Sequence, residues 1–150
     1  MHLYLILKTV HILCATIWLG SGLTIAGDVR RTIAQGRPHT DLLIPRVNRQ
    51  GKTAGIFGML TVLSGINMVF TMGGFGNVGH NIHAGLGLSL LIFAVSLGLS
   101  MPTWRRIRAI LGTEAGDLGE ARKLAGRLGM FTGIEHLLWL VVLVLMVMKF

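Results

Sequence analysis

Four long apolar stretches, separated by short connections, constrain this chain more than any other feature of its sequence. They cover about residues 3–27, 54–72, 82–101 and 130–148. Each offers about the 20 mostly apolar residues that a helix needs to cross the hydrocarbon core of a bilayer. In a chain of 150 residues they leave no room for a second domain of ordinary size. The sequence therefore predicts a single all-α domain, 1–150, built as a bundle of four transmembrane helices.

The composition argues against the ordinary classes of soluble protein. Only 13% of the residues are charged, against about a quarter in a typical soluble domain, and the mean hydropathy is +0.68. The basic residues are confined to two segments between apolar stretches, so we expect a lipid bilayer and no nucleic acid as partner. A single cysteine, Cys14, rules out an intrachain disulfide and a CxxC motif.

The positions of the basic residues predict the orientation of the bundle. Twelve of the 14 Lys and Arg residues lie in the connections 28–53 and 102–129, which we expect to be basic cytoplasmic loops. The connection between the second and third stretches has none. This pattern predicts an antiparallel bundle with both termini on the outer side. Within the second basic connection, residues 113–128 are typical of an amphipathic helix with Thr113 as its N-cap.

Ionisable side chains inside the apolar stretches are the candidate functional residues, because they are costly in a bilayer and usually serve a function. These are His11 in the first stretch, His83 at the start of the third, and Glu135 and His136 in the fourth. If the uncharged cores of the stretches define their ends, His11 and His83 lie at nearly the same depth, whereas His136 lies about 18 Å from the outer end.

The residues around two of these histidines fit a flat porphyrin. Ala15 follows His11 by four positions and Gly87 follows His83 by four, so each imidazole has a small residue beneath it on its helix. Opposing imidazoles hold b-type haem in helix bundles. We therefore expect His11 and His83 to ligate a haem b iron, with His136 as the substitute ligand.

Other residues near this pair have both functional and structural interpretations. Lys8, one turn before His11, could pair with haem propionates or extend to the interface, and Trp18 could flank the ring or pack in the core. His83 could instead be a hydrated loop-end residue, and His11 could bind a neighbouring helix. Glu135 and His136 could form a proton path, a second ligand site or a polar contact that fixes helix packing.

An alternative use of the outer residues is copper binding. Met68 and Met72 lie four residues apart at the end of the second stretch, close in sequence to His80 and His83. Thioether and imidazole ligands suit Cu(I). This pattern favours transport or handling of a metal, without haem.

The first stretch resembles a group of small bacterial membrane proteins that includes HemJ-type protoporphyrinogen oxidases and CopD-like copper-resistance proteins. Residues 7–22 carry the shared Lys8, His11, Trp18 and Gly20, and residues 82–86 are similar to the start of the corresponding HemJ-type helix. The chain departs from the HemJ-type pattern at Gly85, where those proteins have a lysine. The CopD-like members also have more spans.

The resemblance implies a multi-pass protein of the bacterial inner membrane that binds haem b at His11. We therefore expect a membrane haem protein that transfers electrons, or oxidises a quinol or porphyrinogen-like substrate. The sequence does not decide whether the protein is an enzyme, and a haem-dependent oxidoreductase is one interpretation. The alternative is CopD-like transport of copper or another small solute. The 21 glycines, many of them inside the stretches, favour tight helix packing and a homo-oligomer.

Overall fold

In the computed structural model, which describes residues 2–148, every regular element is helical. The chain runs along the molecule four times. The first pass contains α1 (His2–Leu23) and α2 (Ile25–Gln35), and the second contains η1 (His39–Leu42) and α3 (Leu43–Thr71). After the short η2 (Phe75–Asn77), the third pass consists of α4 (His80–Val95), η3 (Ser96–Ser100) and α5 (Met101–Leu111). The fourth pass is α6 (Leu118–Val147).

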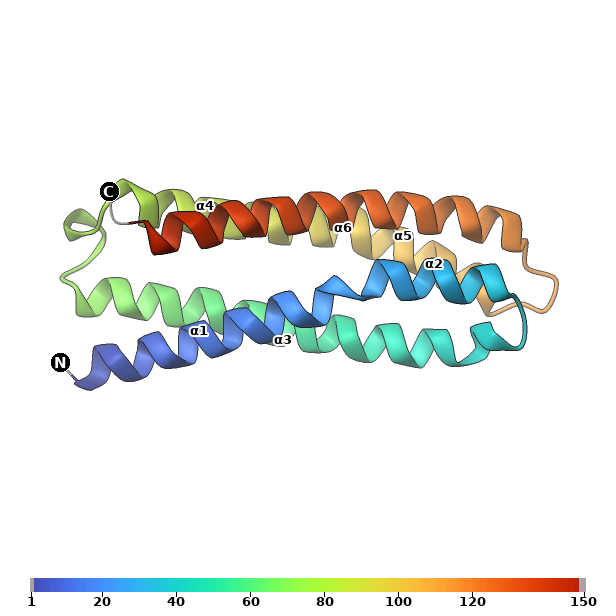
Figure 1. Ribbon diagram of the computed structural model, residues 1–150, viewed down its shortest axis with the longest axis horizontal. Helices are drawn as coiled ribbons and strands as arrows, with labels where there is room; N and C mark the ends of the chain where they lie inside the picture. Colours follow the sequence, from blue (N-terminus) through green and yellow to red (C-terminus); the bar gives the residue numbers. More distant parts are fainter. Residues whose placement is uncertain (1, 149–150) are drawn as a thin grey trace.

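All four passes are long and apolar enough to cross a membrane, which confirms the predicted all-helical fold with four candidate spans. They contain 34, 33, 32 and 30 residues. At about 1.5 Å per residue they are about 45–51 Å long, whereas the hydrocarbon core is about 30 Å thick. The beginning of α1 and the end of α6 lie at the end of the molecule that also carries the connection 72–79 (Figure 1). Each pass is therefore longer than the hydrocarbon core is thick.

The two connections expected as basic loops are mostly helical. Only residues 36–38 and 112–117 separate the helices there. The amphipathic helix expected at residues 113–128 starts at Leu118 as the beginning of α6, and the predicted N-cap is wrong. Asp117 is the N-cap, because its carboxylate accepts a hydrogen bond from the Gly119 amide at 2.7 Å. Thr113 instead donates its hydroxyl to the Ile110 carbonyl.

These helical segments form what we call the basic bundle: α2, residues 43–53 of α3, α5 and residues 118–129 of α6. The basic bundle contains the main hydrophobic core. Its apolar residues recur every three or four positions, the spacing that places them on one helix face. The fully buried members of this core include Val29, Ile33, Leu43 and Ile107.

An ion pair adds to the contact between two helices of the basic bundle. Arg46 of α3 places its Nε 2.7 Å from Asp28 Oδ2 on α2, and its Nη2 donates to Asp28 Oδ1 at 2.9 Å. The same Nη2 donates to the Thr32 hydroxyl at 3.1 Å. The charged pair thus lies beside the apolar core and ties α2 to α3.

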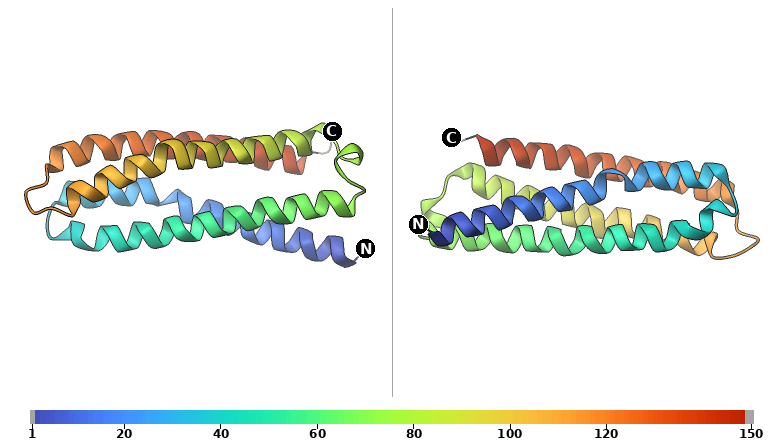
Figure 2. Two further views of the ribbon diagram at one scale, coloured as in Figure 1. Left: turned by 180° about the vertical axis from the view of Figure 1, so that it is seen from behind. Right: turned by 60° about the horizontal axis from the view of Figure 1, so that its bottom comes forward.

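The remaining part of each pass, which we call the apolar segment, exposes large apolar side chains instead of burying them. Leu3, Phe70 and Leu137 are among its exposed residues. Lipid is as apolar as leucine, so packing there depends on close approach and hydrogen bonds. Two helix pairs result, α1 with α3 and α4 with α6, as the views of Figures 1 and 2 agree. The consecutive helices α3 and α4 hardly touch.

Candidate functional site

A cavity of about 660 Å³ lies where the apolar segment meets the basic bundle. Residues from all four passes line it. Two interruptions of the helices lie at the same position along the bundle as this cavity. The first is the break at Thr24 between α1 and α2, which follows the sequence Gly20-Ser21-Gly22 and appears as a bend in Figure 1. Gly22 and Ile25, on the two sides of this break, both line the cavity.

The second interruption is η3, a π-helical turn caused by Pro102. Proline has no amide hydrogen, and its ring clashes with the carbonyl four residues back, here that of Gly98. The backbone hydrogen bonds of the helix change before the proline, where the Met101 amide donates to the Ser96 carbonyl five residues earlier instead of four. This turn places Ser96 and Ser100 on the cavity wall. Pro102, directly after the third apolar stretch, was the sequence signal for this feature.

Aromatic rings form much of the apolar wall. Trp18 of α1 stacks on Phe93 of α4, with ring centroids 5.2 Å apart and planes 24° apart. This stack joins the two helix pairs, and it lies against Gly58 of α3. Trp104 of α5 donates its indole N–H to Asn48 Oδ1 of α3 at 2.9 Å. Together with Trp139 of α6, all three tryptophans of the chain line this one cavity.

The polar groups of the cavity are an imidazole, a carboxylate and cations. Glu135 accepts a hydrogen bond from the Ser100 hydroxyl at 2.7 Å. His136 places Nε2 3.6 Å from the point where a Cβ on Gly22 would lie, so the absent side chain leaves room for this ring. Lys52, Arg105 and Arg108 also line the cavity and are exposed, which places them at its mouth. Sequence reasoning missed these cations, because they belong to segments expected to be loops.

Three of the predicted site residues thus come together at this cavity: Trp18, Glu135 and His136. His11 has a different environment. Its Nδ1 lies 2.9 Å from the Thr61 carbonyl and 3.2 Å from the Ser64 hydroxyl, and its ring packs on Gly65 of α3. A carbonyl only accepts, so Nδ1 carries the hydrogen and Nε2 is left as the basic nitrogen.

His83 lies near the connection 72–79. It is exposed, its Nδ1 bonds to the Gly79 carbonyl at 3.2 Å, and its ring lies 5.9 Å from Phe75 and 6.4 Å from His80 between centroids. Within residues 2–148, no hydrogen bond or aromatic contact joins His83 to His11.

The remaining predicted residues lie outside this cavity. Lys8 is exposed on α1, Ala15 is half-buried, and Gly87 has open space where a side chain would be. Of the residues considered for copper, Met72 is exposed beside the connection that carries the neighbouring histidines, and Met68 is half-buried. No group of three His, Cys, Asp or Glu side chains in the described range is arranged to hold a metal ion.

The chain was compared with protein-family models, with curated proteins and with solved structures, and none of the three comparisons found a match.

Proposed function

We propose that this protein is a membrane-embedded haem b protein that transfers electrons, with the haem in the cavity and His136 as a ligand to its iron. The main support for this proposal is the cavity itself, which combines an imidazole, aromatic walls and three cations. Its volume of about 660 Å³ lies within the range of cofactor sites. In this proposal the bundle is antiparallel in a bacterial inner membrane, its termini face outward, and the cavity lies near the cytoplasmic surface.

The residues of the cavity fit haem in three ways. A neutral imidazole ligates iron through one ring nitrogen, and Gly22 leaves space beside Nε2 of His136. The Trp18–Phe93 stack and Trp139 provide flat apolar surfaces. Lys52, Arg105 and Arg108 at the mouth could each form a charge-assisted hydrogen bond to a propionate. The iron would supply one-electron chemistry, while the protein orients the ring and excludes water.

Glu135 has a separate role in the proposal. It is the one carboxylate among the residues that line the cavity, and the Ser100 hydroxyl holds one of its oxygens. Oxidation of a quinol or porphyrinogen-like substrate releases protons as well as electrons. A carboxylate fixed at the cavity wall is suited to accept such a proton, so we assign this role to Glu135.

His11 and His83 remain a second candidate ligand pair. The Nδ1–H of His11 donates to the Thr61 carbonyl, which is the partner that commonly orients a ligating imidazole. His83 has the same kind of contact with the Gly79 carbonyl. The ligand variants below therefore test both sets of histidines.

The experiment is the visible absorption of protein expressed with ample haem and purified in detergent, oxidised and then reduced with dithionite. We expect a Soret band, with α and β bands on reduction. His136→Ala should remove most of the Soret absorbance per protein. His11→Ala and His83→Ala should retain it, as should the control His39→Ala, an exposed residue of η1.

Two results would contradict the proposal in different ways. A colourless wild-type protein would reject haem binding, and bound copper in that protein would favour the transport alternative. Full haem content in His136→Ala, with loss of haem in His11→Ala or His83→Ala, would instead assign His11 and His83 as the haem ligands.

A further inference from the structure

The basic bundle carries a concentrated layer of positive charge. We call the Lys and Arg residues of α2, of α5, of residues 43–53 and of residues 118–129 the cationic layer. Each of the four helices contributes two or three of them. Apart from half-buried Arg46, all of these side chains are exposed. The layer therefore surrounds the bundle instead of covering one face.

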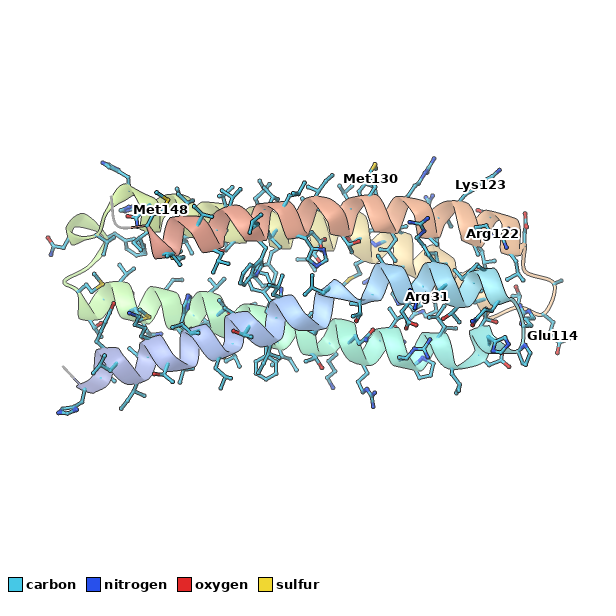
Figure 3. All side chains as sticks on the ribbon, viewed as in Figure 1. Arg31, Glu114, Arg122, Lys123, Met130 and Met148 are labelled. Atoms are coloured by element: carbon cyan, nitrogen blue, oxygen red, sulfur yellow. The ribbon has the colours of Figure 1, made fainter. Side chains whose placement is uncertain are left out.

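The protein supplies little negative charge to balance this layer, because the helical segments that form it carry two acids, Asp28 and Glu120, against eleven Lys and Arg residues. Within residues 2–148 the one ion pair joins Asp28 to Arg46. Asp41 in η1 and Glu114 and Asp117 in the connection 112–117 lie at the far end of the bundle. In Figure 3, Arg122 and Lys123 lie between Met130 and Glu114, which is at that end. Three of the six acids of the chain thus lie beyond the level of the cations.

The level of the cationic layer matches that of lipid headgroups. Arg127 precedes Met130 by three residues and Arg122 precedes it by eight, so their Cα atoms lie about 4–12 Å beyond the apolar segment. The headgroup region of one leaflet is about 5–8 Å thick. The Cα atoms that lie beyond the headgroup region are still within reach of it, because long Lys and Arg side chains can extend back to the headgroups. At this level, cations from four helices also repel one another.

We propose that the cationic layer binds the headgroups of anionic phospholipids in the adjacent leaflet, and that these lipids stabilise the basic bundle by screening repulsion between its helices. A phosphate can bind two guanidinium groups from different helices. A ring of lipids fits a layer that surrounds the bundle. An acidic soluble protein approaching along the bundle axis would first meet Asp41, Glu114 and Asp117. This proposal does not depend on haem binding.

The test compares the protein in nanodiscs of phosphatidylcholine with nanodiscs that also contain phosphatidylglycerol. Native mass spectrometry measures the lipids retained, and circular dichroism at 222 nm measures thermal unfolding. We expect preferential retention of phosphatidylglycerol and a midpoint higher by about 3 °C or more in the anionic discs. The variant Arg31→Gln, Arg106→Gln, Arg122→Gln, Lys123→Gln should lose most of both effects.

Two controls separate charge from other consequences of mutation. The variant Arg31→Lys, Arg106→Lys, Arg122→Lys keeps the charge and should behave like the wild type. Glu114→Gln changes charge outside the layer and should leave the lipid preference unchanged. Equal midpoints and no lipid preference in the wild type would overturn the proposal, as would an undiminished preference in the glutamine variant.

Discussion

At Gly58 of α3, side chains from two other helices lie close to the backbone beside the cavity. A Cβ there would lie 2.9 Å from Phe93 Cζ and 2.9 Å from Trp18 Cε2, closer than carbon atoms pack. We expect Gly58→Ala to disturb the Trp18–Phe93 stack and to lower the free energy of unfolding by about 1–3 kcal/mol. Unfolding in mixed detergent and SDS micelles measures this change.

Gly55, three residues earlier in α3, provides the matched control. A Cβ at this position has no neighbour within 4 Å, so Gly55→Ala should be neutral or slightly stabilising. Equal destabilisation by both substitutions would show that the helix backbone, and not the aromatic stack, responds to the added methyl group.

At the level of single residues, the sequence indicated part of the candidate site. Glu135 and His136 stand out because ionisable groups are rare in apolar stretches. The sequence could not show which helix each side chain meets, because periodicity defines a face but not its partner. His11 illustrates the difficulty: depth suggested His83 as its counterpart, whereas its hydrogen bonds go to α3.

Among the helices, η3 offers a test of how the third pass shapes the cavity. Pro102→Ala would restore an amide that can bond to the Gly98 carbonyl, and so would favour a regular α-helix. Ser96 and Ser100 would then turn relative to Glu135. We expect a higher thermal midpoint but less haem retained per protein. Circular dichroism and Soret absorbance on one preparation measure both effects.

Pro45 is the control for this substitution. It lies in the first turn of α3, where the amide hydrogen has no partner within the helix. Pro45→Ala should therefore change neither the midpoint nor the haem content appreciably. If Pro102→Ala also changes neither, the π-helical turn has no part in ligand binding.

The helices also show why residues 28–53 and 102–129 were expected to be loops although they are mostly helical. A high density of Arg residues made 28–53 and 102–129 resemble loops. The apolar positions Val29 and Ile33, and likewise Ile107 and Leu111, are nevertheless four apart, which is the amphipathic helical pattern. Hydropathy alone locates membrane spans, whereas the extent of a helix beyond the membrane requires this weaker periodic signal.

For the whole molecule, the basic bundle and the apolar segment should respond differently to loss of apolar volume. Ile107 is 0% exposed in the basic bundle, whereas Leu137 is 66% exposed in the apolar segment. We expect Ile107→Ala to lower the free energy of unfolding by about 2–5 kcal/mol. Leu137→Ala should change it by no more than about 0.5 kcal/mol. SDS titration of both variants tests this contrast, and similar losses would contradict it.

The overall architecture of the molecule could be predicted from the sequence better than the packing of its helices could. Four apolar stretches sufficed to predict four long helices, because only helices satisfy their own backbone within a bilayer. Glycines suggested close helix approach, which occurs at Gly65 against His11 and at Gly85 against Met146. The homo-oligomer that the glycine faces favoured stays a prediction.

The gathering of every tryptophan around one cavity makes the chain's intrinsic fluorescence a local reporter. Trp18, Trp104 and Trp139 are on three different passes, yet they all line the same space. Emission excited at the red edge of indole absorption would therefore arise beside the cavity, without an added label. A ligand that enters should quench or shift this emission, and a titration of the purified protein would then give its affinity directly.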